Sequence, residues 1–127
     1  MSELPELLFS KSHEWVRIDD DIATVGITAH AQEELGDVAL ILFPEVGRVL
    51  QVDEKFGEIE SIKAVSDLFS PIAGEVIAVN EELETSPELV NDDTQAAGWL
   101  IQIRAFIPMD TSELLSAEEY DELVMEH

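Results

Sequence analysis

The sequence predicts a mainly β protein: a flattened barrel or sandwich of two similar halves, with one short internal helix and a C-terminal helix. Most apolar residues fall in short runs of strand length separated by Gly, Pro, Asn or Asp, a pattern typical of strands joined by turns. One turn-and-strand pattern occurs twice in the chain. Only two segments, 28–34 and about 111–125, favour helices. These observations together predict layers of short strands packed on one another.

Strands are expected wherever an apolar run of strand length lies between turn residues. The expected strands cover residues 13–18, 22–27, 37–43, 48–52, 55–61, 65–69, 75–80 and 98–107. The acidic run 19–21 suits a hairpin turn between the first two strands. Thr28 provides an N-cap for the internal helix, and Gly36 is suited to its C-terminal end.

The repeated pattern covers residues 42–54 and 68–81. Each copy passes through a glycine, Gly47 or Gly74, into an apolar strand. Two copies are too few for a solenoid, which needs about three, but they suit a sandwich or barrel of two similar halves. Lys63 lies between the copies, so the turn that holds it joins one half to the other.

The last third of the chain contains a polar stretch, a strand and an acidic helix. Residues 81–97 are polar and include Pro87, and they predict a long loop. Ser116 and Glu119 have the spacing of a capping box within the helix expected at about 111–125. No Pro-rich or Gly/Ser-rich linker interrupts the sequence, so residues 1–127 are expected to form a single domain. The apolar residues expected on one face of the C-terminal helix are Leu114, Ala117, Tyr120 and Val124.

Composition excludes several classes of protein. The chain has 127 residues and no Cys, which excludes a disulfide framework, a thiol nucleophile and a zinc–thiolate site. No apolar run reaches the roughly 18 to 20 residues that span a bilayer, and the acidic N-terminus lacks the basic start of a signal peptide. The formal net charge of -23 argues against nucleic-acid or membrane partners and favours partners with basic docking faces. We expect a cytoplasmic protein, or a mitochondrial-matrix protein whose transit peptide has been removed.

Lys63 is the most informative residue in this acidic chain. The chain holds 6 Lys and Arg against 29 Asp and Glu, and Lys63 stands where two strand-like runs meet. A lysine at a hairpin tip is reachable by a modifying enzyme and is free to swing. This placement suits a protein that carries a covalently attached group, because the chemistry then belongs to the attached group.

The sequence around Lys63 resembles the lipoylation motif of glycine cleavage system H proteins. Two segments carry this resemblance, 60–67 (ESIKAVSD) and 70–76 (SPIAGEV). The similarity extends along nearly the whole chain, because further fragments match in order. These fragments are 12–16 (SHEWV), 23–28 (ATVGIT), 30–32 (HAQ), 35–37 (LGD), 44–47 (PEVG), 87–91 (PELVN) and 98–100 (GWL).

The resemblance implies a lipoyl/biotinyl-type fold and a carrier that catalyses nothing itself. Lipoate would be joined to the amine of Lys63 as an amide by a lipoate-attaching enzyme. A pyridoxal-phosphate glycine decarboxylase would load an aminomethyl group, and a tetrahydrofolate-dependent aminomethyltransferase would remove the methylene unit and release ammonia. A flavin-dependent dihydrolipoamide dehydrogenase would then reoxidise the dithiol.

The resemblance also implies a cleft that shelters the loaded arm from hydrolysis. Glu14 and Asp67 stand at matching positions suited to holding a charged arm, with Ser12 as a hydrogen-bond partner. Two departures from the family pattern limit what is carried over. Glu34 stands where some relatives have histidine, and segment 93–97 lacks a more usual aromatic residue.

Three other functions remain open at this stage. The first is an H-like lipoyl donor or carrier for another lipoate-dependent pathway. The second is a biotin carrier, although biotin sites usually place methionine on both sides of the lysine, where this chain has Ile62 and Ala64. The third is an acidic interaction module in which Lys63 stays unmodified.

Metal sites are not favoured by the sequence. His13, His30 and His127 are far apart in the sequence, and no Cys accompanies them, so we expect each to be a bonded or exposed side chain and not a metal ligand or general base. The acidic runs 19–21 and 91–93 lack the spacing of a calcium-binding EF-hand loop and are expected to be solvated turns.

Overall fold

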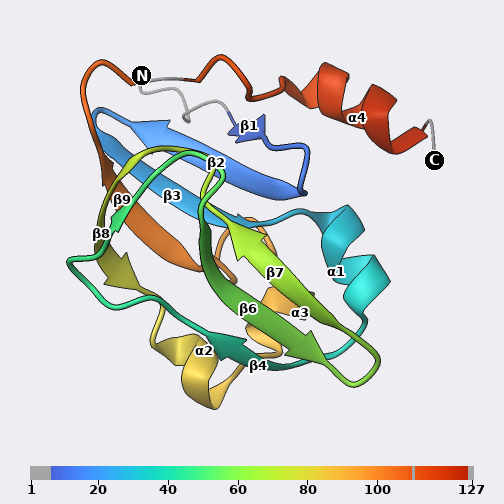
Figure 1. Cartoon of the computed structure of the whole chain (residues 1–127). Coiled ribbons are helices and arrows are strands. Elements are labelled where there is room, and N and C mark those ends of the chain that lie inside the picture. The colour runs from blue at the N-terminus through green and yellow to red at the C-terminus, as the bar shows by residue number, and fades with distance from the viewer. Residues whose placement is uncertain (1–6, 110, 126–127) are drawn as a thin grey trace, which may run out of the picture.

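The structure, a computed structural model that describes residues 7–109 and 111–125, consists of two antiparallel sheets packed face to face (Figure 1). The strands are β1 (Leu7–Phe9), β2 (Glu14–Asp19), β3 (Ile22–Ile27), β4 (Val38–Leu42), β5 (Val49–Leu50), β6 (Lys55–Ser61), β7 (Val65–Phe69), β8 (Gly74–Val79) and β9 (Ile101–Ala105). The larger sheet has the order β1-β2-β3-β9-β8-β5, and the smaller has the order β4-β6-β7. The predicted mainly β sandwich is confirmed.

Four helices accompany the sheets in the described part of the chain. They are α1 (Ala29–Leu35), α2 (Glu82–Thr85), α3 (Leu89–Asp92) and α4 (Ala117–Met125). The internal helix α1 has the predicted ends: the Thr28 hydroxyl accepts a hydrogen bond from the amide of Ala31, and Gly36 ends the helix at φ 75°. None of the described helices is long and apolar enough to cross a membrane.

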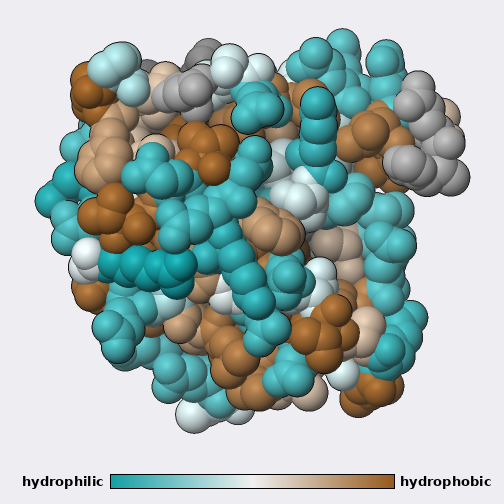
Figure 2. All heavy atoms as spheres, viewed as in Figure 1, coloured by the Kyte–Doolittle hydropathy of each residue, from teal (hydrophilic) through white to brown (hydrophobic). Residues whose placement is uncertain are grey.

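The core forms between the inner faces of the two sheets. In β9, Ile101 and Ile103 are fully buried, while Arg104 between Ile103 and Ala105 is exposed, as the alternation of side chains along a strand requires. Polar residues cover much of the surface seen in Figure 2, with separate apolar residues among them. Close packing of the mostly aliphatic core side chains fixes the position of the two sheets relative to each other.

The two copies of the repeated pattern play the same part in the fold. Each one carries the chain from the smaller sheet to the larger sheet, from β4 to β5 in the first copy and from β7 to β8 in the second. The copies also pair with each other through β5 and β8. The amide of Gly47 donates to the carbonyl of Val76 at 2.7 Å, and the amide of Val76 donates to the carbonyl of Arg48 at 2.9 Å.

Several details of the predicted elements are wrong or missing. Segment 81–97 is not a plain loop, because α2 and α3 lie in it and each buries one apolar residue, Leu83 or Val90. Strand β5 covers only Val49–Leu50, where the sequence predicted a strand over 48–52. Strand β1 was not predicted, because three residues give too short a pattern to recognise.

The C-terminal helix begins at Ala117 and not near 111. The capping box sets this start: the amide of Ser116 donates to Glu119 at 3.0 Å, and the amide of Glu119 donates to the Ser116 hydroxyl at 3.2 Å. The residues before it form a turn, closed by a hydrogen bond from the amide of Leu114 to the carbonyl of Thr111, and Leu115 then exchanges two backbone hydrogen bonds with Phe9 of β1.

The face that α4 buries differs from the predicted face. Tyr120 and Val124 pack on a small second core with Phe9 and Trp15, as expected for two of the four residues. Ala117 is exposed, and Leu114 packs on the main core instead. The shift follows from the later helix start, which leaves Leu114 outside the helix.

Candidate functional site

Lys63 lies at the tip of the β6–β7 hairpin, where the sequence placed it. The Ser61 hydroxyl accepts hydrogen bonds from the amides of Lys63 at 3.2 Å and Ala64 at 3.0 Å. The amide of Ser61 also donates to the carbonyl of Ala64 at 2.8 Å. Lys63 and both of its neighbours are exposed, and Ile62 keeps 78% of its surface in solvent. The backbone of the tip is therefore fixed, while its side chains are open to another protein.

The stem of Lys63 passes over Gly36, the residue that ends α1. A Cβ atom on Gly36 would lie 3.2 Å from Cε of Lys63, which is tighter than an ordinary contact. Gly36 also has a positive φ of 75°, which side chains other than glycine rarely adopt. Glycine suits this position for two reasons: it adopts the positive φ without strain, and it leaves room for the lysine stem.

Asn91 holds the segment beneath the hairpin in place. Its amide Nδ2 donates to the carbonyl of Gly36 at 2.7 Å, and its Oδ1 accepts from the amide of Val38 at 2.9 Å. The carbonyl of Asp37, between them, accepts from the amide of Ile62 at 3.3 Å. The sequence interpretation missed this role of Asn91. The signal for it was the fragment 87–91, which was used only to recognise the family resemblance.

Glu14 is a buried carboxylate at the start of β2. Its Oε1 accepts hydrogen bonds from the hydroxyls of Ser10, at 2.6 Å, and Ser12, and its Oε2 accepts from the amide of Phe69 at 3.2 Å. Burial raises the pKa of Glu14 to about 7, although the three hydrogen bonds oppose the rise. The negative charge of Asp53 raises the pKa further by a smaller amount. Glu14 therefore changes its charge near neutral pH.

A pocket of about 330 Å³ separates the lysine hairpin from α1 and from the turn before β2. Ser12 lines this pocket, and Glu14 lies buried behind Ser12. Asp67 is placed differently, because its carboxylate forms an exposed ion pair with Lys55 at 3.2 Å on the β6–β7 hairpin. The structure thus brings Ser12 and Glu14 together and puts Asp67 in another set of contacts. The residues that line the pocket are Ser12, His13, Ala31, Glu34, Leu35, Ala64, Val65 and Ser66.

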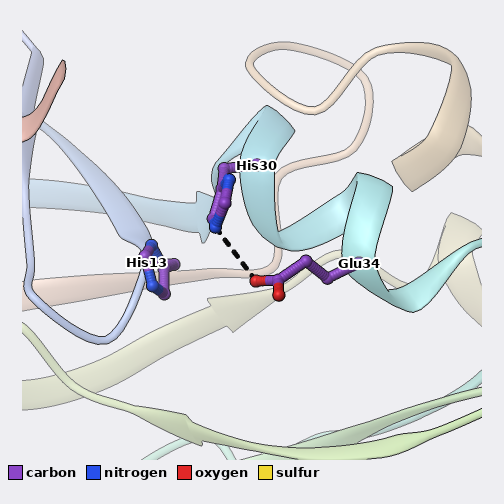
Figure 3. Close-up of side chains that lie close together, drawn as sticks. All are labelled: His13, His30 and Glu34. Atoms are coloured by element: carbon purple, nitrogen blue, oxygen red, sulfur yellow. Dashed lines mark ion pairs between the residues drawn. The ribbon is translucent and has the colours of Figure 1, made fainter. Parts of the chain in front are cut away.

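Two histidines that are distant in the sequence meet beside this pocket. The rings of His13 and His30 have centroids 4.8 Å apart. His13 Nδ1 lies 2.6 Å from the Tyr120 hydroxyl, and His30 Nε2 lies 3.0 Å from Glu34 Oε1 (Figure 3). Each ring has a bonded partner, as the sequence predicted. The sequence did not indicate that His13 and His30 meet, which follows from the turn before β2 and helix α1 being neighbours in the fold.

The fold and this site define a class of protein. A β sandwich that presents an exposed lysine on a rigid hairpin, next to a shallow pocket, is the arrangement of a small carrier protein. The chemistry of such a protein lies in what the lysine bears and in the enzymes that reach it.

Comparison with known proteins identifies the family. The family model described as glycine cleavage H-protein matches residues 7–127. The glycine cleavage system H protein of Rubrobacter xylanophilus is 55% identical over 94% of this chain and 94% of its own length. That of Herpetosiphon aurantiacus is 50% identical over 98% of this chain and 95% of its own. A crystal structure of the Mycobacterium marinum H protein superposes with a TM-score of 0.88 at 35% identity, covering 94% of this chain and 97% of that one.

The chain belongs to the glycine cleavage H-protein family. It is a non-catalytic lipoyl carrier protein of the glycine cleavage system. The family resemblance, the carrier function and the absence of a catalytic role that the sequence predicted are confirmed. Members of this family normally carry lipoate, and the residue that bears it in this chain is considered next.

Proposed function

We propose that Lys63 bears lipoate as an amide on its Nζ atom. The observation that carries this proposal is the exposed position of Lys63 at a hairpin tip whose backbone is held by Ser61. An attaching enzyme needs the amine in solvent, and a swinging arm needs a fixed pivot. When bound, lipoate supplies a disulfide ring that opens reductively as it takes up the aminomethyl group. The pocket beside the hairpin provides a surface on which the arm can rest.

Glu14 and Ser12 are proposed to stabilise the loaded, positively charged arm, together with Asp67. Ser12 lines the pocket and donates to Glu14, so a change in the Ser12 rotamer would expose the carboxylate to the arm. Because the pKa of Glu14 is about 7, it is partly ionised at neutral pH and gains a favourable partner when a cation arrives. Asp67 adds negative charge on β7, the strand that follows the hairpin tip, and can exchange its ion pair with Lys55 for one with the arm.

This cleft proposal is tested by the lifetime of the loaded arm. Changing Glu14→Gln and Asp67→Asn together should speed the loss of the aminomethyl group from the isolated loaded protein. The single change Glu60→Gln removes one acidic charge from β6 and serves as the control. An unchanged decay rate in the double variant would contradict the proposal.

The proposed partners are glycine decarboxylase, the aminomethyltransferase, dihydrolipoamide dehydrogenase and a lipoate-attaching enzyme, all in the cytoplasm. Membership in the glycine cleavage family supports this set. The net charge of -23 supports docking through basic faces on these enzymes. Association should therefore slow as salt is added, because screening weakens long-range attraction between opposite charges.

Intact mass spectrometry with peptide mapping tests the attachment. The full chain is incubated with lipoate ligase, lipoate and ATP, and the matched variant Lys63→Arg is treated in the same way. We expect a single lipoyl increment on the Lys63 peptide of the wild type and none in the variant. A biotin-sized increment on protein from its own host would favour the biotin carrier, and an unmodified wild-type mass would favour the interaction module.

A further inference from the structure

The pairing of His13 and His30 with Glu34 places three metal-ligating side chains in one cluster. One potential ligand atom from each residue lies within 4.8 Å of the others. His30 and Glu34 are one turn apart on α1, so they point to the same side, and His13 faces them from the turn before β2 (Figure 3). Two imidazoles and one carboxylate are a ligand set that Zn²⁺ accepts in proteins.

His13 is oriented for such a role by residues outside the cluster. Its backbone has φ 73° in the turn just before β2 begins, and its carbonyl accepts a hydrogen bond from the amide of Thr28 at 3.0 Å. Its Nδ1 is hydrogen bonded to the Tyr120 hydroxyl, which lies 2.7 Å from the Thr28 hydroxyl at the start of α1. Metal-binding histidines usually bond the ion with one ring nitrogen and a protein group with the other, which fixes the ring. Here Tyr120 is the group that fixes the ring.

We propose that His13, His30 and Glu34 form a site for a divalent transition-metal ion of the Zn²⁺ type. The ion would bind one imidazole nitrogen from each histidine and one carboxylate oxygen of Glu34. A fourth position remains for water or a small ligand, as in zinc sites with three protein ligands. Mg²⁺ and Ca²⁺ are expected to bind poorly, because they prefer oxygen ligands.

The geometry needs only small adjustments around the ion. Bonds of about 2.1 Å in a tetrahedron put ligand atoms about 3.4 Å apart, the His30–Glu34 pair at 3.0 Å is slightly closer than that, and no separation in the cluster exceeds 4.8 Å. The Glu34 side chain is 67% exposed and can move to close the remaining distance. The net charge of -23 raises the local concentration of cations near the site.

A bound ion would sit at the edge of the lysine pocket. His13 and Glu34 line that pocket together with Ala64 and Val65 of the hairpin. The ion would therefore place a positive charge close to the space proposed for the arm. Binding itself needs only the polypeptide, so the metal site can be tested apart from the lipoyl function.

The test is calorimetric titration of the full, unlipoylated chain with Zn²⁺ at pH 7.5. An excess of Mg²⁺ is present to occupy the many other carboxylates. We expect one saturable equivalent of Zn²⁺, with the Kd raised at least tenfold by His30→Gln and by Glu34→Gln. The matched control is Glu33→Gln, which removes the same charge as Glu34→Gln from the neighbouring residue of α1 and should leave the Kd unchanged. An equal Kd in the wild type and in all three variants would overturn the proposal.

Co²⁺ provides a second readout that a diffuse acidic surface would not give. A four-coordinate Co²⁺ site should absorb strongly in the visible range at one equivalent, and the absorption should be lost in His30→Gln. His30 is used because its ring is partly exposed, so its replacement should leave the fold intact, which circular dichroism checks. Only the weak spectrum of hydrated Co²⁺ in the wild type would count against the site.

Discussion

The two walls of the pocket next to Lys63 are built in opposite ways. On the hairpin side, residues 62–64 are exposed, and the hydroxyl of Ser61 fixes the turn. On the other side, Ser12 lines the pocket, and Glu14 behind it is 1% exposed and accepts three hydrogen bonds with its carboxylate. The first wall can present a side chain to partners, and the second holds a charge in a fixed position. Under the proposed function, the first wall provides a lysine that partner enzymes can reach, and the second provides a rigid place for the loaded arm.

The largest effect is expected from the exposed wall, in the change Lys63→Arg. Arginine keeps the positive charge and the long stem but has no amine that can form the lipoyl amide. We expect glycine-dependent release of CO₂ by the reconstituted enzymes to fall to the level seen without the carrier. Because the side chain is exposed, the unfolding midpoint should stay that of the wild type.

Lys55→Arg is the matched control for that change. Lys55 lies on the same hairpin but is engaged by Glu58 and Asp67. Its replacement should leave the release of CO₂ unchanged. Carrier activity that survives Lys63→Arg but not Lys55→Arg would show that the attachment site has been assigned to the wrong lysine.

On the buried side of the pocket, Glu14 should make the free energy of unfolding depend on pH. The pKa of Glu14 is raised from 4.5 to about 7 in the folded protein, so folding favours the protonated form. Below pH ~4.5 this group therefore stabilises the folded state by about 3 kcal/mol. This contribution to the free energy of unfolding is lost as the pH rises through ~7. Urea unfolding at a series of pH values measures this loss.

Glu14→Gln isolates the contribution of this one carboxyl from the other acids. Glutamine is neutral at every pH, so the variant should lack the loss that the wild type shows between pH ~4.5 and ~7. The other carboxylates contribute equally to both proteins and cancel in the difference. A free-energy difference between wild type and variant that does not change with pH would show that Glu14 is not the group responsible.

The sequence predicted those parts of the fold whose causes are local. Thr28 and Gly36 act on the helix between them, and Ser116 and Glu119 act on each other. The lysine turn was likewise recognisable because its motif is continuous along the chain. In these places the residues that determine a local structure lie close in the sequence to the residues that form it, so the spacing pattern predicts the structure.

Contacts between distant segments could not be predicted in this way. Phe9 pairs with Leu115, and His13 meets His30 only because the fold brings their segments together. The burial of Glu14 is of the same kind, because it depends partly on the amide of Phe69. Hydrophobic spacing reports which face of an element is buried, but it does not say which element covers that face.

Gly36→Ala tests the contact between the lysine stem and the residue that ends α1. At φ 75° and ψ -146°, alanine is strained by about 2 kcal/mol, and its Cβ would crowd Cε of Lys63 at 3.2 Å. We expect lower stability in urea and a changed rate of lipoylation by the ligase. Gly47→Ala is the control, because Gly47 has φ 100° but a Cβ atom there would have nothing within 4 Å apart from its chain neighbours. It should lower stability without altering lipoylation, and equal lipoylation rates in both variants would show that the crowding has no consequence.

The smallest effect is expected from the ion pairs on the outer face of the hairpin. Lys55 Nζ lies 3.3 Å from Glu58 and 3.2 Å from Asp67, and all three side chains are substantially exposed. Water and salt screen such pairs, so Lys55→Gln should lower the urea midpoint slightly at low salt and not at all at high salt. Lys11→Gln makes the same change in net charge on another exposed lysine and separates the pairs from the general repulsion among the acids. A loss that persists at high salt in Lys55→Gln alone would mean that the outer face of the hairpin is as firmly held as the Glu14 wall, and the contrast between the two walls would fail.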